Sequence, residues 1–241
     1  GGQFGKKGIG VEVSQILETT DIYKSPIAFQ NVYGAGSPSN GYEGGFLADG
    51  SLQRTANSWG PKMDGRSINQ YMPNGELTPF VPHPDNWKAL YQSGLNSTTS
   101  VAINGGAEKS SFRVSYAYTD NNGVFKRNSF SRHAISFKGL TELNHVFSVE
   151  AGVNYAFSTS MNGASQGGWN WGGNLAMMST YYTPRNMDMA AYEGMYRDPV
   201  TKAVETTSPW GTLRGYLHNR DLNLNQRSEN SLLSNLTLRA K

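Results

Sequence analysis

The sequence predicts an all-β protein whose strands form part of an antiparallel transmembrane β-barrel. Three observations favour this fold class: segments in which every second residue is apolar, strands longer than those of most soluble domains, and connections that sort into long and short ones. The alternation is clearest from Ser111 to Ser158. A period of two places successive side chains on opposite faces of a strand, and a helix does not use it.

Strand length separates two folds that share this pattern. From Phe147 to Phe157, apolar residues alternate with small or polar ones. A soluble β-sandwich also alternates, but its strands average about 5–6 residues, whereas a strand tilted across a bilayer needs about 9–11. About 13 residues rising roughly 3.3 Å each and tilted about 40° climb roughly 33 Å, which exceeds an apolar band of about 25 Å.

Aromatic residues lie towards the ends of the alternating segments. Tyr116 and Tyr118 are near the end of one segment, and Tyr155 and Phe157 are near the end of another. Rings at these places are typical of the girdle that a membrane barrel has at the lipid headgroups.

The first half of the chain is predicted to hold a strand, a long loop and two more strands. The first strand rests on Ile9, Val11 and Val13. The loop after it is rich in Pro, Gly, Asn and Ser, which disfavour a central strand. Val101 and Ile103 alternate in the second strand, which we expect to close through the turn 105–109 into the third.

The second half is predicted to hold a hairpin, another long loop and a last strand. Ile135 and Phe137 define the fourth strand, and a tight link at 141–145 leads into the fifth. Two short helices are expected in the loop, near 175–182 and 187–196. The last strand rests on Leu232, Leu236 and Leu238, although Leu233 breaks its alternation. The predicted strands are 8–20, 97–104, 110–119, 130–139, 146–158 and 228–240, and the predicted long loops are 21–96 and 159–227.

The order of the connections is long, short, medium, short and long. Because each hairpin reverses the chain, the long connections lie at one end of the sheet and the short ones at the other. This sorting is typical of outer-membrane barrels, which have short periplasmic turns and long extracellular loops. Since the smallest such barrels have about 8 strands, we expect residues 1–241 to form part of one larger barrel domain.

Composition excludes several classes of function. The net charge of +3 is spread along 241 residues, which gives a nucleic-acid partner little electrostatic support. Cysteine is absent, so disulfides, cysteine nucleophiles and zinc–cysteine sites are excluded. No run of about 18 apolar residues predicts a transmembrane helix, and the first residues lack a signal-peptide core. We expect Gly1 to be an internal position of a longer precursor.

Tryptophans in the predicted loops are the candidate ligand-binding residues. Trp59, Trp169 and Trp171 are flanked by glycines and amides such as Asn170, a combination able to stack on and hydrogen-bond a polar ligand. The alternative is that these rings pack a long loop against itself.

No motif predicts an enzyme, and we expect no catalytic residue, metal ion or cofactor. The sequence around Ser165 fits G-x-S-x-G, but it stands in a glycine-rich loop instead of a strand–turn–helix unit, so a hydrolase rests on this serine alone. The four histidines lack paired metal-ligand spacing. Glu150, Arg113 and Lys138 are interpreted as hydrated residues of a polar barrel wall.

Several ordered motifs resemble the SusC/RagA family of TonB-linked outer-membrane transporters. The resemblance covers most of residues 1–157 in order and is closest from Ser97 to Lys138. The motifs are Gln30-Asn31-Val32-Tyr33-Gly34-Ala35-Gly36, Ser58-Trp59-Gly60-Pro61-Lys62-Met63-Asp64-Gly65, Pro84-Asp85-Asn86-Trp87, Gln92-Ser93-Gly94, Ile103-Asn104-Gly105-Gly106, Ser111-Phe112-Arg113-Val114-Ser115-Tyr116 and Gly123-Val124-Phe125.

The resemblance implies a 22-stranded barrel with an N-terminal plug in the bacterial outer membrane. It also implies import of oligosaccharides or peptides, driven by TonB, under a lipoprotein lid of the SusD type, and it leaves open a dimer of transporter–lid pairs. The plug, the TonB box and the later strands do not occur in this sequence. A soluble β-rich glycan-binding or adhesin module is the alternative interpretation.

Overall fold

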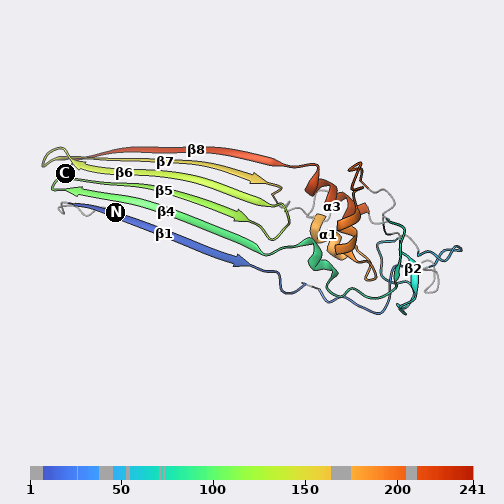
Figure 1. Cartoon of the computed structure of the whole chain (residues 1–241). Coiled ribbons are helices and arrows are strands. Elements are labelled where there is room, and N and C mark those ends of the chain that lie inside the picture. Colours follow the sequence, from blue (N-terminus) through green and yellow to red (C-terminus); the bar gives the residue numbers. More distant parts are fainter. Residues whose placement is uncertain are drawn as a thin grey trace.

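The computed structural model describes residues 8–25, 27–37, 46–52, 55–70, 72, 74–163, 175–204 and 211–240. The molecule has two regions, because long strands alternate with long loops along the chain. One is a six-stranded antiparallel sheet, and the other is built from the loops at one end of it (Figure 1).

The sheet contains a strand in each of the six predicted places. The strands are 13–15 residues long, which exceeds the roughly 9–11 residues that a tilted strand needs to cross a bilayer. Their order in the sheet follows the order in the sequence, and every neighbouring pair is antiparallel. The strands are β1 (Gly8–Thr20), β4 (Gly94–Ala107), β5 (Ser110–Asn122), β6 (Ser129–Glu142), β7 (Phe147–Met161) and β8 (Gln226–Ala240).

The predicted sorting of the connections is confirmed. The tight turns β4–β5 and β6–β7 lie at one end of the sheet, together with the end of β8 (Figure 1). The connections β1–β4, β5–β6 and β7–β8 lie at the other end, and the two long ones build the second region. The sheet is open, because β1 and β8 each pair on one side only.

The predicted turn at 105–109 is wrong in its extent. Gly105 and Gly106 continue β4, and only Glu108 and Lys109 form the turn. Glycine has a reason to be in this strand: a Cβ on Gly105 would lie 2.1 Å from the Phe112 ring of the neighbouring strand. Gly105 therefore makes room for an aromatic ring, and neither glycine reverses the chain.

The two long loops fold together into a region that we call the loop module (residues 21–93 and 162–225, where described). Helices α1 (Leu175–Tyr181) and α2 (Met189–Met195) are in the places predicted for short helices. Helix α3 (Gly211–Asp221) was not predicted, although Leu213, Tyr216 and Leu217 are buried at helical spacing. The other elements are β2 (Ser67–Asn69), β3 (Leu77–Pro79) and the 3-10 helix η2 (Asn86–Leu90).

Nearly all buried apolar side chains belong to the loop module. Its larger core packs residues of η2 and the three helices around Tyr192 and Leu217, and its smaller core surrounds Leu52 and Phe80. Among the described residues, Ala102 is the only buried apolar side chain of the six-stranded sheet. None of the described helices is long and apolar enough to cross a bilayer.

Candidate functional site

The register of the sheet collects apolar side chains on one face, which we call the apolar face. Across all six strands, Val13, Val101, Tyr116, Ile135, Tyr155 and Leu232 form one continuous row. The neighbouring row joins Val11, Ile103, Val114, Phe137 and Val153. In every one of these residues the side chain is exposed, so no described part of the chain covers this face.

Aromatic rings gather on the apolar face towards the loop module. Tyr118, His133 and Phe157 are direct neighbours in the register, and we call them the aromatic row. The ring centroids of Tyr118 and His133 are 4.7 Å apart, and those of His133 and Phe157 are 6.4 Å apart. The Tyr116 hydroxyl is 2.8 Å from His133 Nδ1, so this histidine is part of a hydrogen-bonded aromatic cluster.

The apolar band has a definite height along the strands. On β7 it extends from Phe147 to Phe157, which are ten residues apart. Ten steps of roughly 3.3 Å, tilted by about 40°, span about 25 Å, which matches the lipid-facing band of outer-membrane barrels. Beyond the aromatic row, the next positions on this face are polar in five of the six strands. Apart from Leu17 of β1, this row consists of Ser97, Asp120, Ser131, Thr159 and Ser228.

The opposite face of the sheet, the polar face, has charges that pair across the strands. Glu150 of β7 accepts hydrogen bonds from Lys138 at 2.8 Å and from Arg239 at 3.1 Å. Arg113 of β5 donates to Glu12 at 3.0 Å and to Asn104 at 2.7 Å. The predicted wall residues Glu150, Arg113 and Lys138 are therefore each paired with an opposite charge, in two separate groups.

Arg185 joins three segments of the loop module. Its Nη2 donates to the carbonyls of His83 and Pro84 at 2.9 and 2.8 Å, and its guanidinium lies 4.5 Å from the centre of the Phe29 ring. The side chain is only 3% exposed, and burial lowers its pKa, which the charge of Asp85 opposes. It stays charged because arginine does not lose its proton in proteins.

A second polar network fixes the β5–β6 connection to the helices. Lys126 and Arg220 both pair with Glu193 of α2, and Arg220 also pairs with Asp221. Burial raises the pKa of Tyr196 to about 12, and its hydrogen bond to Asp221 acts in the same direction. Burial would raise the pKa of Asp221, but hydrogen bonds from Arg220 and Tyr196 hold it below its ordinary value.

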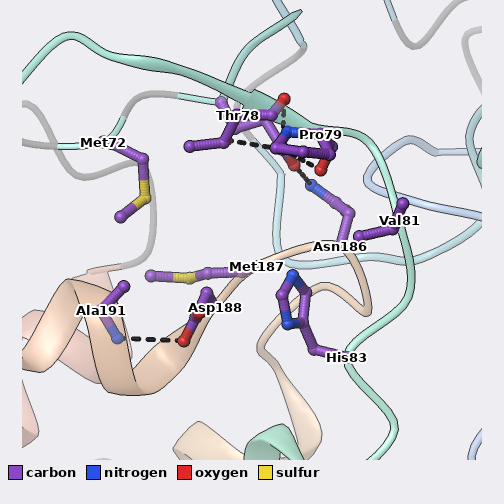
Figure 2. Close-up of a pocket in the computed structure, with 10 residues that line it drawn as sticks. Met72, Thr78, Pro79, Val81, His83, Asn186, Met187, Asp188 and Ala191 are labelled. Atoms are coloured by element: carbon purple, nitrogen blue, oxygen red, sulfur yellow. Dashed lines mark hydrogen bonds between the residues drawn. The ribbon is translucent and has the colours of Figure 1, made fainter. Parts of the chain in front are cut away.

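A cavity of about 180 Å³ lies between β3 and α2 (Figure 2). In this close-up, the side chains of Met72 and Met187 extend toward each other, and Thr78 and Pro79 close one side. His83 and Asp188 also line a larger, more open hollow of about 550 Å³ beside it. The lining residues are Gln70, Met72, Thr78, Pro79, Val81, His83, Asn186, Met187, Asp188 and Ala191.

Of the predicted ligand-binding residues, the structure describes only Trp59. Trp59 is 50% exposed on the loop module, and its backbone amide donates to Gly36 at 3.1 Å. Trp87 is buried and packs edge-on against Tyr91, as the loop-packing alternative expects of a tryptophan. Trp169, Asn170, Trp171 and Ser165 lie outside the described residues.

Sequence reasoning missed the residues that line the cavity. His83 is one of four histidines without metal-ligand spacing, and no recognised motif contains Gln70, Asn186 or Met187. Their sequence spacing offered no signal, because Gln70 and Asn186 are 116 positions apart and meet only through folding of both long loops. In the part of the chain that the structure describes, no cluster of His, Cys, Asp and Glu could hold a metal ion.

Comparisons with known proteins give one partial similarity. No family model matches the chain. A stretch of 120 residues, half of this chain, is 27% identical to the TonB-dependent receptor SusC of Bacteroides thetaiotaomicron. That stretch covers 12% of the length of SusC. The similarity agrees with the family that the sequence motifs resemble, and it hints at TonB-dependent transport at the outer membrane.

Proposed function

We propose that this chain forms part of the barrel wall of a SusC-like, TonB-dependent nutrient importer in the bacterial outer membrane. The cargo is an oligosaccharide or a peptide, a SusD-like lipoprotein acts as the lid, and TonB supplies the energy. The partial similarity to SusC and the ordered sequence motifs support this assignment.

The observation that carries the proposal is the two-faced sheet. Six strands of 13–15 residues have exposed aliphatic and aromatic side chains on one face and paired charges on the other. In water, an apolar face of this extent would be covered by another layer. In a bilayer, the apolar face contacts lipid and needs no covering layer, while the polar face lines a hydrated interior.

The proposed mechanism is binding and passage, with no covalent step. Arg113 and Lys138 are neighbours across β5 and β6, and each is paired with a carboxylate, Glu12 or Glu150, so the wall presents compensated ion pairs to the interior. Selection then depends on the loop module, where the exposed Trp59 and the cavity beside His83 lie. The lipid-facing side chains anchor the wall and do not take part in selection.

Single-cysteine labelling tests the orientation of the two faces. The chain has no cysteine, so one introduced thiol is a unique label. We expect a polarity-sensitive fluorophore on Val153→Cys to report lipid and the same fluorophore on Asn154→Cys to report water, because neighbouring residues of β7 face opposite sides. Both variants are measured in vesicles, and equal polarity at the two sites would contradict a bilayer-spanning sheet.

Fractionation separates the proposal from a soluble glycan-binding or adhesin module, the second candidate, which the exposed Trp59 ring favours. We expect the chain to sediment with outer membranes, to resist an alkaline wash and to require detergent for extraction. Recovery of folded chain in water without detergent would favour the soluble module.

A further inference from the structure

The cavity between β3 and α2 is large enough to hold one amino-acid side chain. Its volume of about 180 Å³ exceeds that of a protein cavity known to bind benzene, which is about 150 Å³. Met72, Met187, Pro79, Val81 and Ala191 make much of its wall. Methionine thioethers adapt to ligands of different shape and make favourable contacts with aromatic rings.

The amide groups of the cavity wall are already engaged with each other. Gln70 Nε2 donates to Thr78 Oγ1 at 2.8 Å and to the Pro79 carbonyl at 2.9 Å. Gln70 Oε1 accepts from Asn186 Nδ2 at 2.7 Å, and Asn186 Oδ1 accepts from the Ala35 amide at 2.7 Å. A sugar ring here would bury hydroxyls with few free partners, at a cost of about 1–3 kcal/mol for each unsatisfied group.

The two polar residues with capacity to bind a ligand lie where the cavity meets the open hollow. Within the described part of the chain, the His83 imidazole makes no hydrogen bond, while its backbone is fixed by bonds to Arg185 at 2.8 and 2.9 Å. Asp188 uses Oδ1 to accept from Ala191 at 2.9 Å. The hollow beyond them is also lined by Asp85 and Lys88. The polar groups at the mouth can bond the main chain of a bound polypeptide, and the apolar groups inside can contact one of its side chains.

We propose that this cavity binds an apolar side chain, with an aromatic ring favoured, of a polypeptide whose main chain lies across the open hollow. Main-chain amides of the ligand donate to Asp188 and its carbonyls accept from His83. The site selects polypeptide over oligosaccharide. As an assignment of cargo class, this inference rests on the proposed import function and deepens it. Binding itself depends on the loop module alone, so it can be measured wherever the sheet lies.

Methyl NMR of methionine tests the site directly on the full chain in detergent. The probes are N-acetylphenylalaninamide, N-acetylalaninamide and maltotriose. We expect the phenylalanine probe to shift the Met72 and Met187 methyl signals, with half-saturation on the order of 1 mM for a ligand of this size. The alanine probe and maltotriose leave both signals unchanged at the same concentrations, because neither presents a large apolar group.

A matched pair of variants locates the binding. Ala191→Met fills the cavity from α2 and is expected to abolish the response of the Met72 signal, whereas Ala203→Met adds the same side chain at an exposed position and preserves it. The proposal is overturned if maltotriose shifts the two signals and the phenylalanine probe does not, if no probe shifts them, or if Ala191→Met retains the response. None of these outcomes bears on membrane insertion, which the cysteine labels measure separately.

Discussion

The sheet and the loop module use apolar side chains in opposite ways. In the loop module, Leu217 and Tyr192 have no exposed surface, whereas Leu232 on the apolar face of the sheet is 70% exposed. The module resembles an ordinary water-soluble core, and the sheet has almost no core of its own. This difference is what the proposed function requires of a chain that meets both water and lipid, with the aromatic row near the boundary between them.

Removing a core side chain from the module gives the largest expected effect. We expect Leu217→Ala to destabilise the loop module by about 2–5 kcal/mol, because the side chain is fully buried among the helices. Leu232→Ala is the matched control, and it removes the same atoms from an exposed position. Limited proteolysis in detergent reports opening of the module, and equal sensitivity of the two variants would contradict the division into two regions.

A charge introduced on the apolar face tests the sheet, the second region of the comparison. We expect Val153→Arg to destabilise the inserted sheet by about 2–4 kcal/mol, the cost of arginine at the bilayer midplane. Asn154→Arg, one residue further along β7, places the same charge on the polar face and is expected to be tolerated. Urea unfolding from lipid vesicles measures both variants. A similar loss of stability in the two would show that neither face meets lipid.

Acid is expected to weaken the module before it affects the sheet. The pKa of Asp221 is lowered in the fold, so its contribution to stability is present above the ordinary aspartate value of 3.8 and is lost as the pH falls below it. Denaturant titration of the module at about pH 6 and about pH 3 should show the loss. Asp221→Asn should reduce this pH dependence; an unchanged profile would remove Asp221 as its cause.

The smallest effect is expected on the polar face. Glu150→Gln removes two ion pairs, but Lys138 and Arg239 are both exposed, so we expect only a slight change in the free energy of unfolding, which shrinks further in high salt. Urea unfolding from vesicles at low and high salt measures it. A loss of several kcal/mol, insensitive to salt, would indicate that this face is dry and would contradict a hydrated interior.

The strands could be predicted because their pattern is local. Alternation located β1 at 8–20, and the same rule gave the remaining strands to within a few residues. It failed at Gly105 and Gly106, which continue β4 and do not mark a turn; at Gly105 the lack of a Cβ accommodates the Phe112 ring across the sheet. It also missed α3, whose buried Leu213 and Leu217 are separated by a glycine that interrupts the helical signal.

The candidate site was not predictable in the same way. Trp59 was singled out from its composition and is exposed, but nothing in the local sequence linked Gln70, His83 and Asn186. These residues come from two loops that are separated by four strands of the sheet. They are joined by the hydrogen bond from Asn186 to Gln70 and by those from Arg185 to the carbonyls of His83 and Pro84.

The sequence by itself determined the strands, their two faces and the sorting of long and short connections, because a period of two and the length of a strand are properties of consecutive residues. Only the tertiary structure decided the register that joins Tyr118, His133 and Phe157, the ion pairs of Glu150, and the cavity between β3 and α2. These features depend on residues far apart in the chain, and their contacts are set by packing that no local pattern encodes.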